Sequence, residues 1–200
     1  MLTWANYMKE LFLLEQDLIE QESFCQSYDL PEELDDNVVT TTKLETTESI
    51  KEYKQKDLIF TFRNNIIGDH LFVIGNYNII SQKFADLLTK YVSEKIELIP
   101  VTLRCKGKKN LDYFLLNPLE KRSPIDYEKS ELKQLSTGKI RRVTNLSIKE
   151  DSFSEIDMFR FEEFKTRLIV SAELKEEIEK EKLTGVSFRP LKDFQFPYKH

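Results

Sequence analysis

Apolar residues near the start of the chain recur at helical spacing, which predicts a helix over residues 4–24. The positions that set this spacing are Trp4, Tyr7, Met8, Leu11, Leu14, Leu18 and Ile19. The end of the pattern is weak, and a strand over residues 11–14 fits the same residues. The polar stretch from Asp29 to Glu48 contains Pro31 and a run of threonines, and it predicts a loop.

Short apolar runs rich in β-branched and aromatic residues predict several strands further along the chain. These runs cover residues 58–62, 71–74 and 112–116, and alternating basic and apolar residues over 140–148 predict one or two more. Gly138, between Thr137 and Lys139, predicts a hairpin turn before the last of these runs.

An internal repeat is the central pattern of the sequence, because residues 79–101 align with residues 169–191 without a gap. The identities are few, but the apolar positions match throughout. The identical pairs are Ile79/Ile169, Ser81/Ser171, Lys90/Lys180 and Pro100/Pro190. Each copy therefore predicts the same local structure.

The residue types in each copy predict a strand, a helix and a second strand. A serine after two apolar β-formers is suited to cap a helix N-terminus by accepting a hydrogen bond from a free backbone amide. In the second copy, Gly185 is expected to close the helix in a left-handed conformation. Pro100 and Pro190 are expected to stop the returning strands.

These elements predict a single α+β domain with more strand than helix. Its expected architecture is a mixed β-sheet that carries the two strand–helix–strand units, 79–101 and 169–191. We expect an acidic N-terminal segment over residues 1–55, formed by a helix or strand plus a loop. The α+β domain is expected to cover residues 56–195.

Composition narrows the class of protein. The 200 residues are 40% hydrophobic and 32% charged, with only 5 glycines, which excludes disordered and collagen-like chains. No apolar run has the length of a membrane span, and the first residues lack the apolar core of an export signal. Cys25 and Cys105 fit no metal spacing and are expected to be reduced thiols in a cytoplasmic protein.

Charge is strongly segregated along the chain. Residues 10–42 contain ten acids and no base, whereas residues 104–142 contain eleven bases and five acids, in a chain of net charge −5. The two regions could cover each other in the fold. The alternative is that the acidic segment offers a surface to a basic partner.

The sequence offers little catalytic chemistry. It has only two histidines, His70 beside Asp69 and the terminal His200, and it has no recognisable nucleophile, metal-binding or phosphate-binding motif. We therefore predict no enzyme, no metal and no cofactor. Arg141–Arg142 and Lys108–Lys109 could contact phosphate, but without a glycine-rich loop or an aromatic stacking surface we expect no nucleic-acid partner.

The C-terminal part of the chain resembles an immunity-protein family of bacterial polymorphic toxin systems, numbered eleven and formerly listed as a domain of unknown function. The residues that carry this resemblance are Phe159–Phe161, Arg167–Ser171, Leu174–Lys175 and Leu183–Leu191, with looser matches at Ile79–Ser81, Phe84, Tyr113–Asn117, Ile125–Asp126 and Ser130. The resemblance covers roughly residues 56–191. It implies a cytoplasmic antidote without catalytic residues, which binds a cognate toxin made by the same cell.

Three hypotheses follow. The first is an immunity protein that masks a toxin, with the acidic segment as its contact for a basic partner; the candidate contact residues are Asp29, Glu32, Glu33, Asp35 and Asp36. The second is an adaptor module that binds a partner without neutralising it. The third is a hydrolase built from carboxylates and His70.

Overall fold

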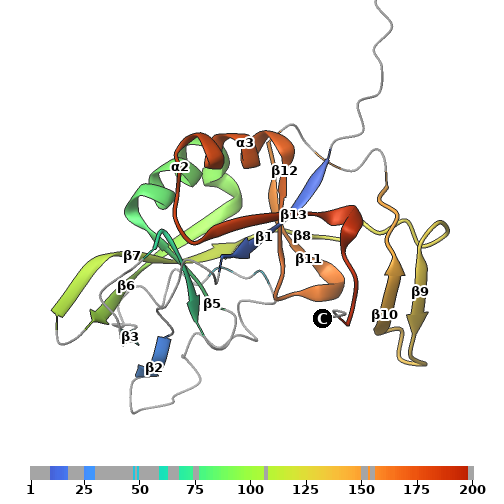
Figure 1. Cartoon of the computed structure of the whole chain (residues 1–200), viewed down its shortest axis with the longest axis horizontal. Helices are drawn as coiled ribbons and strands as arrows, with labels where there is room; N and C mark the ends of the chain where they lie inside the picture. The colour runs from blue at the N-terminus through green and yellow to red at the C-terminus, as the bar shows by residue number, and fades with distance from the viewer. Residues whose placement is uncertain are drawn as a thin grey trace, which may run out of the picture.

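The computed structural model describes most of the chain from residue 68 onwards and shorter pieces before it (Figure 1). The described residues are 10–17, 25–29, 47, 49, 59–62, 68–73, 77–105, 108–149, 153 and 156–197. The α+β class is confirmed within these residues. The strands form two large sheets and a two-stranded sheet, where the sequence predicted one sheet.

The six-stranded sheet has the strand order β2-β3-β6-β7-β5-β4. Its strands are β2 (Cys25–Asp29), β3 (Ile59–Phe62), β4 (His70–Val73), β5 (Tyr77–Ser81), β6 (Ile96–Cys105) and β7 (Lys108–Pro118). Only β3 and β6 pair in parallel, so the sheet is mixed. The predicted strands over 58–62, 71–74 and 112–116 are confirmed where the structure describes them.

The five-stranded sheet has the order β13-β1-β12-β11-β8, and a separate hairpin joins β9 to β10. The strands of the sheet are β1 (Leu11–Gln16), β8 (Lys121–Arg122), β11 (Met158–Phe161), β12 (Leu168–Ser171) and β13 (Val186–Pro190). The hairpin strands are β9 (Glu131–Gln134) and β10 (Ile140–Asn145), and Gly138 turns between them at φ 79° as predicted. The parallel pair of this sheet is β8 with β11.

Two helices, α2 (Gln82–Val92) and α3 (Ala172–Lys180), lie side by side on the same side of the molecule (Figure 1). Each is capped as the sequence predicted, since the Ser81 and Ser171 hydroxyls each accept a backbone N–H at 3.2 Å. The Tyr91 hydroxyl of α2 donates to a carboxylate oxygen of Glu177 on α3 at 2.5 Å. The helices therefore connect the two repeat units directly.

The predicted repeat is confirmed, and it extends to a longer unit than the sequence alignment covers. In the first half, β4-β5-β7-β6 are neighbours with α2 between β5 and β6; in the second half, β11-β12-β1-β13 are neighbours with α3 between β12 and β13. Every neighbouring pair in both halves is antiparallel. The third strand comes from outside the repeat in each case: β7 follows the first unit, whereas β1 comes from the other end of the chain.

An aspartate precedes the first strand of each half and connects it to the other half. The backbone carbonyls of Asp69 and Asp157 accept the N–H of the capping serine of their own half, at 2.9 and 3.1 Å. The side chain of Asp69 then accepts hydrogen bonds from Thr184, between α3 and β13. The side chain of Asp157 pairs with Lys95, between α2 and β6. Each half is therefore joined to the helix-to-strand connection of its counterpart.

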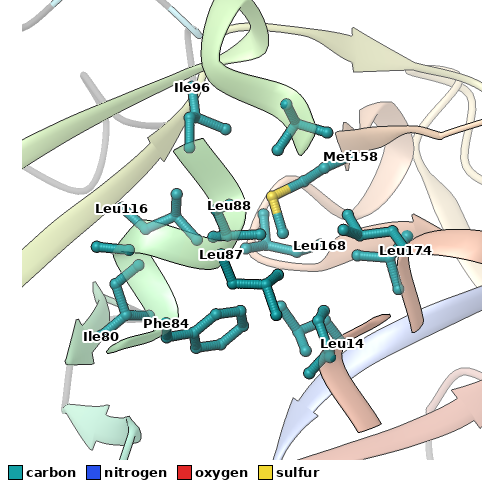
Figure 2. Close-up of a cluster of buried hydrophobic side chains, with 14 of the residues drawn as sticks. Leu14, Ile80, Phe84, Leu87, Leu88, Ile96, Leu116, Met158, Leu168 and Leu174 are labelled. Atoms are coloured by element: carbon teal, nitrogen blue, oxygen red, sulfur yellow. The ribbon is translucent and has the colours of Figure 1, made fainter. Parts of the chain in front are cut away.

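The main hydrophobic core lies between the helices and both sheets, as Figure 2 shows. Phe84 and Leu88 of α2 contribute side chains that are fully buried, and Leu174 does so from α3. Leu14, Ile80, Leu116, Met158 and Leu168 contribute to the same cluster from five different strands. Because one cluster draws on both halves, they form one folding unit.

A second core covers the opposite face of the five-stranded sheet. Alternate residues of β1 divide between the two cores: Phe12 and Leu14 face the helices, while Leu11 and Leu13 face the second cluster. The hairpin contributes Ile140 and Val143 to this second cluster, and the residues after β13 contribute Leu191 and Phe194. The central strands of this sheet, β1, β11 and β12, are therefore buried on both faces over most of their length.

The helix predicted over residues 4–24 is wrong where the structure describes it, because residues 11–16 form strand β1. The alternative strand over 11–14 is confirmed. Four successive apolar residues, Leu11 to Leu14, suit a strand between two hydrophobic layers as well as a buried helix, and only the surrounding sheet decides between them. The loop expected over 29–48 begins one residue late, since Asp29 ends β2, and most of it lies outside the described residues.

Gly185 was predicted to end the second helix and Pro100 to end a strand, and neither residue does so in the structure. The residue after α3 with left-handed backbone is Lys182, at φ 51°, and Gly185, at φ 72°, lies further on, where its carbonyl accepts the Asp17 N–H at 3.1 Å. Pro100 does not end β6, which continues to Cys105. Pairing of β6 with β3 begins only at Thr102, so the proline occupies a part of the strand that the described β3 does not flank.

Candidate functional site

His70, the best candidate for a catalytic base in the sequence, is buried at the junction of the two halves. Its Nε2 lies 3.3 Å from Asn78 Oδ1 and 3.4 Å from Gln16 Nε2, and its ring meets Phe84 edge-on. Burial lowers the pKa of His70 from 6.5 to about 4, so the imidazole is neutral at pH 7. Its neutral ring is thus held by amide side chains from both halves and packs against an aromatic ring of the main core.

The two cysteines lie on strands that do not pair with each other. Cys25 of β2 and Cys105 of β6 both have Phe62 of β3 as their register partner, so β3 lies between them. Two strand spacings separate their backbones by about 9–10 Å, beyond the span of a disulfide. The backbone spacing therefore excludes a disulfide between these two cysteines.

The part of the chain that the structure describes has neither a cluster of metal-ligating residues nor a membrane-spanning helix. No group of three or more His, Cys, Asp or Glu side chains there has the arrangement to hold a metal ion. None of the described helices is both long and apolar enough to span a bilayer.

The acidic residues predicted as a contact surface fall largely outside the described residues. Asp29 ends β2, where its backbone pairs with Ile59, while Glu32, Glu33, Asp35 and Asp36 lie outside the described part.

Other acids of the same segment have partners near the end of the chain. Glu15 pairs with Arg189 at 3.0 Å, and Glu10 pairs with Lys192 at 3.3 Å. These described acids contact bases of β13 and the residues after it, outside the basic region 104–142. These two ion pairs therefore join the acidic segment to the C-terminal part of the chain.

The basic region of the sequence supplies the projecting hairpin. Lys133 of β9 and Arg141 and Arg142 of β10 are exposed, as is Lys139 in the turn, and the hairpin stands apart at one end of the molecule (Figure 1). The sequence indicated both the hairpin turn and the excess of bases. What it could not indicate is that these bases would collect on one projecting element.

Two large hydrophobic residues of the described part are well exposed, and both lie in the segment that carries the hairpin. Leu135, at the start of the turn, is 44% exposed, and Tyr127, before β9, is 45% exposed. The Tyr127 hydroxyl donates to Glu163 Oε1 at 2.7 Å, and desolvation together with this carboxylate raises its pKa to about 12. Exposed tyrosine and arginine side chains within one segment are suited to a protein partner, because these residue types dominate the binding energy of protein interfaces.

The comparison with protein families identifies the class. The model of the immunity protein family (Imm11) matches residues 10–193, nearly the whole of the 200-residue chain. The chain belongs to this family. A comparison with curated proteins gives no match.

The family match is wider than the resemblance visible in the sequence. That resemblance covered roughly residues 56–191, whereas the match begins at residue 10 and so includes β1. The structure gives a reason, because β1 lies between β12 and β13 and completes the sheet of the second half. The aspartates before β4 and β11 were also missed, since the spacing to the serine differs between Asp69–Ser81 and Asp157–Ser171 and the gapless alignment starts after them.

Proposed function

We propose that the protein is a non-enzymatic, cytoplasmic immunity protein that binds a cognate bacterial toxin and neutralises it by covering its working surface. The observation that supports this proposal is membership of the immunity protein family over residues 10–193. The buried, neutral state of His70 is in keeping with a protein that acts by binding.

A co-expression experiment tests the proposal. The polypeptide encoded beside this protein is induced in a bacterial host with and without it, and the two are then co-purified. We expect growth to be rescued and a stable complex to be recovered. Rescue without a complex would favour an enzyme that reverses the damage, and a harmless neighbour would remove the reason for an antidote.

We further propose that the acidic N-terminal segment contacts a basic surface of the toxin through Asp29, Glu32, Glu33, Asp35 and Asp36. Complementary charge accelerates encounter and selects the partner, while buried aromatic contacts supply most of the affinity. Reversing these five residues to lysine should slow association and weaken its dependence on salt. Unchanged kinetics in stopped-flow binding would refute this contact.

A further inference from the structure

The hairpin β9–β10 is anchored to the rest of the molecule along β10 and at its base. Val143 and Phe196 exchange two backbone hydrogen bonds, at 2.8 and 3.2 Å, and Ile140 and Val143 are buried in the second core. The Ser130 hydroxyl accepts the Ser147 N–H at 2.8 Å and fixes the segment before β9 to the segment after β10. A two-stranded hairpin is only marginally stable alone, so these contacts explain why it keeps one shape.

Next to these buried residues, the hairpin carries uncompensated positive charge on its exposed positions. Lys133, Lys139, Arg141 and Arg142 are exposed, and none of them forms an ion pair with any residue that the structure describes. Glu131 is the one acid within the two strands, and it lies opposite Asn145. The strands therefore present an excess of bases to solvent.

The pairing register of the hairpin places two like charges next to each other, which is unfavourable for its stability. Arg142 of β10 is the register partner of Lys133 of β9, next to an irregularity in the pairing at Arg141. Like charges that face each other across an antiparallel pair destabilise a sheet, so this arrangement lowers the stability of the isolated protein. An anionic group bound between the two strands would remove that cost.

We propose that this hairpin docks onto an acidic surface of the toxin, an inference that rests on the proposed function. Lys133 and Arg142 would pair with carboxylates of the partner, and the exposed Leu135 at the tip would add an apolar contact. Because the hairpin is already ordered, little conformational entropy is lost when it binds.

A protein surface fits this element better than a nucleic acid does. The hairpin strands and their turn, residues 131–145, contain no aromatic residue on which a base could stack, and the whole chain has a net charge of −5. The docking surface also differs in sign from the proposed acidic contact, so the two proposals concern different patches of the partner.

A matched pair of double variants tests the docking surface. Lys133→Glu with Arg142→Glu reverses the cross-strand pair but keeps two like charges opposite each other, so the stability of the hairpin should change little. Lys121→Glu with Lys165→Glu makes the same change in net charge at exposed lysines outside the hairpin. The probe is the purified polypeptide encoded beside this protein, with binding followed by stopped flow at low and physiological salt.

We expect the hairpin variant to associate about tenfold more slowly at low salt and to lose protection in vivo, and the control variant to change by less than about twofold. Equal binding by both variants and the wild type would overturn the docking surface while leaving the proposed function intact. Failure of the wild type to bind would instead overturn the proposed function, and with it this inference.

A single substitution separates binding from folding. Lys133→Glu places an acid opposite Arg142, so the melting temperature should rise slightly while association with the toxin slows. A hairpin with only a structural role would show binding that follows stability in the same direction. Binding of a DNA or RNA duplex at physiological salt that is lost with Lys133→Glu and Arg142→Glu, with toxin binding unchanged, would assign the surface to nucleic acid and overturn the proposal.

Discussion

The two halves of the molecule share one topology but are joined to each other in chemically different ways. Asp157, before β11, is fully buried and pairs with Lys95 at 2.8 Å and with Arg122 at 2.6 Å. Asp69, at the equivalent position before β4, is half-buried and accepts neutral hydrogen bonds from Ser81 at 2.6 Å and from the Thr184 N–H at 2.8 Å. The same position therefore holds an ion network in one half and a set of uncharged hydrogen bonds in the other.

This difference shows that the repeat conserves a connection and not a particular interaction. In both halves the aspartate carbonyl bonds the capping serine, and in both the carboxylate reaches the opposite half. The buried site needs cations because a carboxylate without water is unstable unless it is paired. The more exposed site is solvated, so hydroxyl and amide donors are enough.

The largest expected effect is from Asp157→Asn, which removes the charge that Lys95 and Arg122 share. Breaking a buried ion pair from one side costs about 3–5 kcal/mol, and we expect the lower end because both cations remain partly exposed. Urea unfolding should therefore show a loss of about 3 kcal/mol in the free energy of unfolding. A loss no larger than that of Asp69→Asn would contradict the difference between the two halves.

The second-largest expected effect is a pH dependence of stability that is due to His70. This histidine occupies the position that Met158 holds in the second half. Its pKa is about 4 in the folded protein and 6.5 ordinarily, so between these values the unfolded chain binds a proton that the folded chain does not. The free energy of unfolding therefore has its full value above about pH 6.5, and it decreases as the pH falls toward 4. From pH 7 to pH 5 the loss should be about 2 kcal/mol.

A substitution that makes the two halves alike at this position tests whether His70 causes the pH dependence of stability. His70→Met introduces the residue of the second half, and its stability should change little between pH 7 and 5. The chain has only two histidines, so few groups titrate in that range. Proton NMR of the wild type should show the His70 ring still neutral at pH 5, and a variant that kept the full pH dependence would assign it to other groups.

The smallest expected effect is from Asp69→Asn. The substitution keeps one acceptor oxygen but turns an amide NH2 toward the donors of Ser81 or Thr184, at a site that water can reach. We expect a loss of about 1 kcal/mol, close to the net contribution of a typical hydrogen bond. Thr184→Val, which removes the hydroxyl partner, should give a similar loss in the free energy of unfolding. If Asp69→Asn lost more stability than Asp157→Asn, the proposed order of the two sites would be reversed.

The repeat units were predictable because their signals are local. An apolar pair, a serine and an amphipathic run specify strand, cap and helix within a few residues, and Ser81 and Ser171 act as predicted. Gly138 likewise specifies its turn through backbone conformation alone. In these cases short-range physics and the final structure agree.

The remaining features depend on contacts between distant parts of the chain. The apolar run 11–14 became a strand because β12 and β13 flank it, and these strands lie near the other end of the sequence. The ion network of Asp157 joins residues from three separated segments, and no short motif specifies it. For the candidate site, the sequence located the excess of bases but not their projection on a rigid hairpin, which depends on the burial of Ile140 and Val143.

The position of β1 also has a consequence for the timing of synthesis. Leu13 of β1 pairs with Ile169 of β12 on one side and with Arg189 of β13 on the other. Strand β1 therefore cannot take its place in the sheet until β12 and β13 have been made. A ribosome adds roughly 5–20 residues per second, so a chain of 200 residues takes on the order of 10–40 s to complete. The sheet of the second half can therefore close only after β12 and β13 have been synthesised. A chain that stops before β13 would therefore lack the finished sheet of the second half.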